Sequence, residues 1–147
     1  MELKEAFTRS ISEVFTLYRM HPQFPPETTE FSVPFEEQVC VLISFTEVLK
    51  GKVVFKLNKS LGEKIASFMT ETTVESFDAT VKSGLGEIMS FTATLALSKY
   101  NVVKNVSLLP SIIIKGEDIS LMLSGTKSYN LVCQLFNEYI SIIYCLE

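Results

Sequence analysis

The stretch Ser83-Gly84-Leu85-Gly86-Glu87-Ile88-Met89-Ser90 lies near the middle of the longest helix that the sequence predicts. Around it, side chains suited to a core recur with helical spacing at Phe77, Val81, Leu85, Ile88, Thr92 and Leu95. Polar side chains occupy the opposite side at i, i+4, i+7 and i+11, namely Ser83, Glu87, Ser90 and Thr94. Residues at these intervals share one face of a helix. The stretch therefore predicts a helix with one face in the core and one polar face.

Two glycines make this predicted helix unusual. Gly84 and Gly86 each cost about 1 kcal/mol relative to alanine in a helix interior. One interpretation is that something must approach the helix backbone closely at this point. The other is a solvated face on which the glycines ease packing against a neighbouring element, and the pattern alone favours this second interpretation.

The segments before this helix are predicted to form another helix, a hairpin and a second, short helix. Apolar residues three or four positions apart predict an N-terminal helix that ends before three prolines: Leu3, Phe7, Ile11, Val14, Tyr18, then Pro22, Pro25 and Pro26. Alternating residues in 35–45 and 53–57, with the turn-like Lys50-Gly51-Lys52 between them, predict a β-hairpin. Ser60 and Glu63 have the spacing of a capping box, which predicts that a short helix begins there.

After Asn101 the pattern becomes β-like to the end of the chain. Strands are expected in 102–109, 112–114, 119–123, 131–136 and 139–146. Pro110 inside an apolar run indicates an edge position or a bulge, and Asn137-Glu138 can close a terminal hairpin. This order predicts one α+β domain over residues 1–147, with an antiparallel sheet packed with two long helices plus an N-terminal helix.

Composition excludes several classes of function. With 13 basic and 17 acidic residues the formal net charge is -4, which is the wrong sign for a general nucleic-acid binder. No apolar run reaches the ~20 residues that span a bilayer, and the N-terminus lacks a signal-peptide pattern, so we expect a cytoplasmic protein away from membranes. Cys40, Cys133 and Cys145 lie inside apolar runs, which predicts buried structural thiols without a disulfide.

Common catalytic motifs are missing from the sequence. His21 is the single histidine, so histidine metal sites and His-centred triads are poor candidates, and no metal site is expected. Gly84-Leu85-Gly86 has no third glycine and follows no predicted strand, and no P-loop motif occurs. An unrelated small-ligand binder is the least favoured class, because no convergent polar pocket is visible in the sequence.

The stretch 83–90 resembles the signature helix of CheX-type members of the CheC/CheX/FliY phosphatase family. That signature is Asp or Ser, three residues, Glu, two residues, Asn, and here Ser83 and Glu87 hold its first two positions. Gly51-Lys52-Val53-Val54-Phe55-Lys56-Leu57 resembles the strand before the family's first long helix. Leu108-Leu109-Pro110-Ser111-Ile112-Ile113-Ile114-Lys115-Gly116 resembles its proline-containing strand. A single signature copy is typical of CheX.

The resemblance implies a specific activity and partner. Family members remove the phosphoryl group from phosphorylated CheY, the response regulator of chemotaxis, and CheX-type proteins are dimers. The family's Glu pairs with the regulator's active-site lysine, and its Asn orients the attacking water. The phosphoryl acceptor and the divalent metal belong to the regulator, so no cofactor of the chain's own is implied. Ser83, Glu87, Ser90 and Thr94 are the implied receiver-binding residues, with Glu87 and Ser90 catalytic.

This sequence departs from the family pattern at Ser90, which stands where the family has Asn. Serine keeps one hydroxyl and loses the reach and the second polar group of the amide. We therefore expect Glu87 to dock a receiver domain while dephosphorylation is weak or lost. The alternative is a non-enzymatic receiver-binding or dimerisation module of the same fold. A homodimer is also expected from the residues, because Val39–Phe45 and Tyr139–Leu146 carry more apolar faces than one small sheet needs.

Overall fold

The computed structural model describes residues 1–26, 37–47, 49–100, 106–116 and 127–146 of the chain. Its described part contains three helices and six strands. The helices are α1 (Leu3–Leu17), α2 (Lys59–Thr70) and α3 (Ala79–Tyr100). The strands are β1 (Gln38–Glu47), β2 (Gly51–Asn58), β3 (Val106–Leu108), β4 (Ile112–Gly116), β5 (Lys127–Leu135) and β6 (Glu138–Leu146). This order confirms the predicted α+β class.

All six strands belong to one antiparallel sheet in the order β3-β1-β2-β6-β5, with β4 also paired to β1. The predicted hairpins β1–β2 and β5–β6 both form, and β2 pairs with β6 between them. Their turns are shifted from the predicted positions: Gly51 and Lys52 already belong to β2, and the turn before β6 is Phe136-Asn137 and not Asn137-Glu138. The expected strand 119–123, and the parts of other expected strands in 27–36 and 101–105, lie outside the described residues.

Strands β3 and β4 form one edge of the sheet, interrupted around Pro110. Leu108 pairs with Phe45 and Ile112 pairs with Leu42, so three residues of the edge stand against two of β1. One extra residue on one side of a ladder is a β-bulge, and proline fits there because it has no N–H to donate. The bulge is the arrangement that Pro110 predicts.

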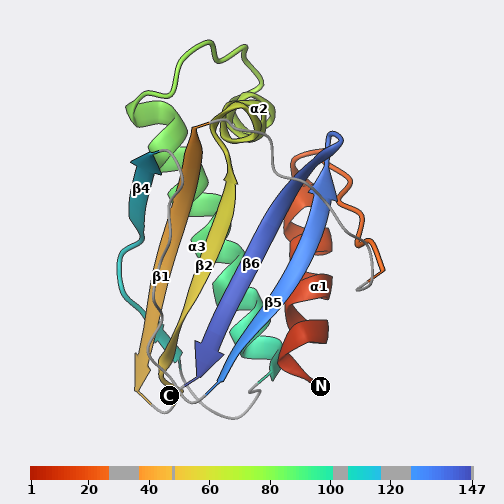
Figure 1. Cartoon of the computed structure of the whole chain (residues 1–147), viewed down its shortest axis with the longest axis vertical. Coiled ribbons are helices and arrows are strands. Elements are labelled where there is room, and N and C mark those ends of the chain that lie inside the picture. Colours follow the sequence, from red (N-terminus) through yellow and green to blue (C-terminus); the bar gives the residue numbers. More distant parts are fainter. Residues whose placement is uncertain (27–36, 48, 101–105, 117–126, 147) are drawn as a thin grey trace.

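Helices α1 and α3 cover one face of the sheet (Figure 1), and the core lies between the two layers. The side chains that point toward the helices from β1 and β2 are buried: Val39, Val41, Ile43, Phe45, Val53, Phe55 and Leu57. Phe7 of α1 lies 6.4 Å from the Phe55 ring and 5.3 Å from the Tyr144 ring, centroid to centroid. Four residues of the predicted stripe are buried and form the core face of α1, namely Leu3, Phe7, Ile11 and Val14, whereas Tyr18 follows the helix and is half-buried. None of the helices in the described part is long and apolar enough to cross a membrane.

The predicted capping box at Ser60 is wrong. Helix α2 begins at Lys59 after the N-cap residue Asn58, which makes no side-chain capping hydrogen bond. Ser60 thus lies inside the first turn, and its hydroxyl is 2.9 Å from Glu138 at the start of β6. Lys64 contacts the same carboxylate at 3.2 Å. Contacts of this kind join α2 to a strand that is distant in sequence, which local spacing cannot predict.

Candidate functional site

Helix α3 carries the four polar residues of the predicted site along one side. Ser83, Glu87 and Thr94 are exposed and Ser90 is half-buried, whereas Val81, Leu85, Ile88 and Thr92 on the other side are buried. The Thr94 hydroxyl donates to the backbone carbonyl of Ser90 over 2.9 Å, so it is turned back onto the helix. The structure thus brings Ser83, Glu87 and Ser90 onto one surface, with Thr94 at its end.

Asp78 sets where this helix begins. Its carboxylate accepts hydrogen bonds from the backbone N–H groups of Thr80 (3.0 Å) and Val81 (3.2 Å). These are N–H groups of the first turn, which have no partner inside the helix, so the contact is an N-cap. This start places Ser83 in the second turn and Glu87 one turn later. An Asp just before a helical pattern is the sequence signal for such a cap, and Asp78 was not among the predicted residues.

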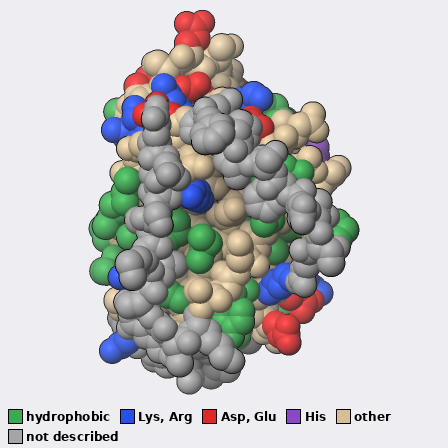
Figure 2. Space-filling model, viewed as in Figure 1, with side chains coloured by type: hydrophobic (Ala, Val, Ile, Leu, Met, Phe, Trp, Pro, Cys, Tyr) green, Lys and Arg blue, Asp and Glu red, His purple; other side chains and the backbone are tan. Residues whose placement is uncertain are grey.

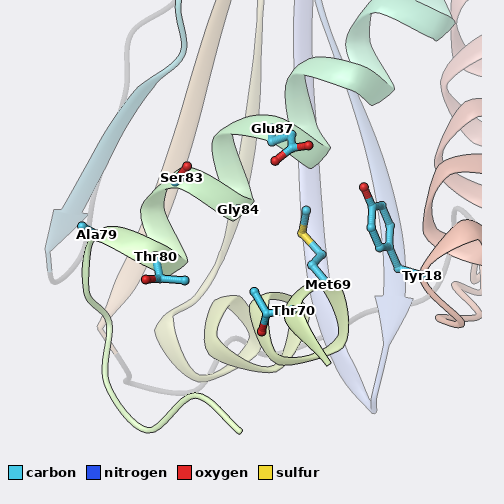
Figure 3. A pocket seen from close by; sticks show the side chains of 8 residues that line it. All are labelled: Tyr18, Met69, Thr70, Ala79, Thr80, Ser83, Gly84 and Glu87. Atoms are coloured by element: carbon cyan, nitrogen blue, oxygen red, sulfur yellow. The ribbon is translucent and has the colours of Figure 1, made fainter. Parts of the chain in front are cut away.

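A hollow of about 460 Å³ opens beside the polar face of α3 (Figure 3). Its lining comes from three elements that are far apart in sequence: Tyr18, Met69, Thr70, Ala79, Thr80, Ser83, Gly84 and Glu87. Tyr18 and Met69 lie around the same opening as the Glu87 carboxylate. Sequence analysis missed both, because nothing in their local patterns indicates that α1 and α2 end next to Glu87. Ser90 and Thr94 do not line this hollow.

The two glycines of the site helix differ in how closely other residues approach them. A methyl group on Gly84 would lie 3.6 Å from the Met69 sulfur, at the contact between α3 and α2. A methyl group on Gly86 would lie only 2.7 Å from the Ser111 hydroxyl oxygen, which is too close to fit without a shift. Gly86 is buried, so the solvated-face interpretation does not hold there, and the close approach of Ser111 confirms the other interpretation at this residue.

Glu87 is the acidic group of this surface. Its carboxylate is exposed and makes no ion pair or hydrogen bond with any residue that the structure describes. An ion pair between an exposed carboxylate and a solvated cation contributes little binding free energy. The same pair contributes more when a docking partner excludes water from it. Glu87 is thus suited to receive a cationic group from a docking protein.

The cysteines are not reactive groups of this site. All three are buried, as the sequence predicts, and none forms a disulfide within the described part of the chain. Burial raises the pKa of Cys133 to about 12. Burial also raises the pKa of Cys40, and the nearby Lys56 lowers it by less. The nucleophilic thiolate is therefore scarce at neutral pH. Within the described ranges, no group of three His, Cys, Asp or Glu side chains lies close enough to hold a metal ion.

The sequence matches one protein-family model, described as "Chemotaxis phosphatase CheX", over residues 39–137. The match covers about two thirds of the chain and includes the site helix. A comparison with curated protein sequences gives no match.

Solved structures of CheX proteins share the fold. The CheX structure from Vibrio vulnificus has a TM-score of 0.82 at 14% identity, covering 100% of this chain and 97% of its own. CheX from Desulfovibrio desulfuricans has a TM-score of 0.81 at 12% identity, covering 100% of both chains. A CheX–CheY–BeF3–Mg²⁺ complex from Borrelia burgdorferi has a TM-score of 0.71 at 13% identity, covering 100% of this chain and 99% of that one. At these identities the likeness concerns the fold.

Proposed function

The chain belongs to the CheX family of chemotaxis phosphatases, and on this premise we propose that it docks a phosphorylated CheY-type response regulator on helix α3 and promotes hydrolysis of its aspartyl phosphate. The observation that carries the proposal is Glu87, an exposed carboxylate at the signature position of the site helix that makes no ion pair or hydrogen bond with a described residue. The Borrelia burgdorferi structure, in which a CheX protein is bound to CheY, supports this choice of partner.

Glu87 is the docking residue of the proposed complex. Its carboxylate pairs with the regulator's active-site lysine, as the family mechanism implies. The pair forms between two surfaces that exclude water, so its loss also leaves a charge without a partner. Ser83, one turn earlier on the same face, is placed to contact the same partner.

Ser90 is the residue nearest to the chemistry. A water oxygen forms the new bond to phosphorus while the bond to the aspartyl oxygen breaks, and the electron pair stays on the aspartate. The products are a carboxylate and dihydrogen phosphate, which keeps both hydrogens of the water. The chain's contribution is to orient that water, and one hydroxyl does this less completely than an amide. We therefore propose a slower phosphatase than Asn-bearing members of the family.

A receiver-binding module without hydrolysis is the second candidate, and Ser90 is the observation that favours it. Both candidates need the same docking surface, so binding and phosphate release must be measured separately. The homodimer and the cytoplasmic location expected from the sequence also belong to this proposal.

The test uses a CheY-type receiver in two forms. Binding of the beryllofluoride-loaded receiver reports docking, and phosphate release from the phosphorylated receiver reports hydrolysis. We expect Glu87→Gln to weaken binding about tenfold or more. The matched control is Glu2→Gln, an exposed glutamate just before α1 that does not line the hollow beside Glu87, and it should bind normally.

Ser90→Asn then separates the two candidates. Restoring the amide should raise the rate of phosphate release on the order of 10- to 100-fold, with binding unchanged. Phosphate release by the native chain supports the phosphatase, and release that appears only with Ser90→Asn supports the binding module. If the receiver binds neither the native chain nor Ser90→Asn, the whole proposal is wrong.

A further inference from the structure

The bulge at Pro110 brings Ser111 against the site helix. Ser111 follows Pro110 and precedes β4, and its hydroxyl oxygen is 2.7 Å from where a Gly86 methyl group would be. The Ile113 side chain, two residues on, lies 3.9 Å from the same point. Both side chains therefore point from the sheet edge toward α3. The absence of a side chain at Gly86 is what lets Ser111 come so close.

Ser111 and Ser90 lie on neighbouring parts of the same surface. Ser90 is four residues after Gly86, so the two share a face of α3 and are separated by about one turn, roughly 5–6 Å between Cβ positions. Because Ser111 contacts the helix at Gly86, its hydroxyl lies within about one turn of Ser90. The contact comes from the side of α3 that faces the sheet edge, away from the hollow that Tyr18 and Met69 line.

Both hydroxyls are available to a ligand. Ser90 and Ser111 are half-buried, so each keeps some contact with solvent. Neither side-chain oxygen has a hydrogen bond with any residue in the described part of the chain, and they do not bond each other. Each therefore offers one donor and two acceptor positions without first breaking an internal bond.

We propose that Ser111 is a further residue of the phosphatase site, where it holds the attacking water together with Ser90. This inference rests on the proposed function. An asparagine amide has a carbonyl oxygen and an NH2 group on one side chain. Here the two polar atoms come from two serines, one on α3 and one on the bulge of the sheet edge. Ser111 thereby supplies the second polar atom that Ser90 lacks, and the rate lost with the amide is partly recovered.

Ser111→Ala tests the role of this hydroxyl in the full-length protein. We expect phosphate release at saturating phosphorylated receiver to fall about tenfold. The dissociation constant for the beryllofluoride-loaded receiver should stay within about twofold, because Glu87 is untouched. Ser98→Ala, on an exposed position of the same helix, is the control and should change neither quantity. Thermal unfolding of each variant reports whether the fold is retained.

Two double variants distinguish a shared water from a structural effect. If both hydroxyls hold one water, the double variant Ser90→Ala/Ser111→Ala should release phosphate only slightly more slowly than the single variant Ser90→Ala. The double variant Ser90→Asn/Ser111→Ala should release phosphate as fast as the single variant Ser90→Asn, because the asparagine amide supplies both polar atoms. A loss of packing at Ser111 would lower the rate in every background and would not be rescued.

Three results would overturn the inference. The first is a Ser111→Ala variant that releases phosphate as fast as the native chain while Glu87→Gln binds the receiver more weakly. This result would be consistent with the proposed function. The second is a native chain that binds the receiver but releases no phosphate beyond the receiver's own rate, which leaves only docking. The third is a receiver that does not bind at all, which also removes the proposed function.

Discussion

Gly51 begins strand β2 where the neighbouring strand leaves no room for a side chain. A methyl group there would overlap the backbone carbonyl oxygen of Cys145 and lie 2.7 Å from the Phe45 ring. A backbone oxygen cannot rotate aside, so Gly51→Ala must push β2 away from β6. We expect the free energy of unfolding, measured by urea denaturation, to fall by about 2–4 kcal/mol.

Gly84→Ala is the matched comparison for that substitution. Its added methyl group would lie 3.6 Å from the Met69 sulfur and 4.0 Å from the Ala66 methyl carbon, which are ordinary contact distances. Alanine also favours the helix by about 1 kcal/mol over glycine. This variant should therefore be at least as stable as the native chain. A Gly51→Ala protein of native stability would show that β2 and β6 can separate at no cost.

The sequence predicts the polar face of the site but not the residues that approach it from other elements. Ser83, Glu87 and Ser90 share a helix face because their spacing is local, and periodicity reports local geometry. Tyr18 approaches α3 from just after α1, and Ser111 approaches it from the sheet edge. Their positions depend on long-range packing, which no spacing rule contains. Glu138, the partner of Ser60, was missed for the same reason.

The hairpin between β5 and β6 depends on a two-residue turn with an unusual backbone. Phe136 and Asn137 have φ values of 51° and 62°, and Leu135 pairs with Glu138 across the turn. Positive φ at both central residues is the type I′ geometry, which asparagine and glycine tolerate and β-branched residues do not. We expect Asn137→Val to lower the free energy of unfolding by about 1–2 kcal/mol.

Asn137→Gly serves as the comparison for this turn. Glycine adopts positive φ without a steric penalty, so the variant should stay within about 0.5 kcal/mol of the native chain in the same urea experiment. The Phe136 ring, 4.9 Å from the Phe68 ring centroid to centroid, holds the turn against α2 in both variants. Equal stability of the valine and glycine variants would contradict a backbone origin of the effect.

Whole elements were predicted better than their limits. The stripes of α1 and α3 and the alternation of β1 and β2 identify these elements, because each buries one continuous face. The start of α2 was misplaced, because a hydroxyl and a carboxylate three residues apart also occur inside a helix. Pro110 predicts the interruption of the sheet edge, since a residue without an N–H cannot continue a ladder.

For the whole molecule, composition and element order predict the α+β class. The resemblance to the family was carried by the signature residues. The solved CheX structures share 12–14% of their residues with this chain and still align over all of it. A sheet with two helices on one face can be built from many sequences that keep the same alternation of apolar and polar residues. The family model that matches residues 39–137 therefore identifies the family where overall identity to these structures does not.

The sheet face turned away from α1 and α3 favours a homodimer. Figure 2 shows hydrophobic side chains on this face. By register, Ile112 of β4 stands beside Leu42 of β1, and Ile143 of β6 lies two strands further on. Ile112 is 55% exposed and also lies on an edge strand, where a second sheet can be joined. Either a face contact or an edge contact between two copies would bury it.

We therefore expect light scattering at micromolar concentration to give twice the 16.5 kDa of one chain. Ile112→Lys should shift the protein toward the monomer, because a lysine buried at the contact would lose its hydration. The control is Ser128→Lys on β5, an exposed position at the opposite edge of the sheet, which should stay dimeric. A monomeric native chain would refute the dimer. If the Ile112→Lys variant is still a dimer, the contact between the two copies does not involve Ile112. A monomeric Ser128→Lys variant would then place that contact at the β5 edge.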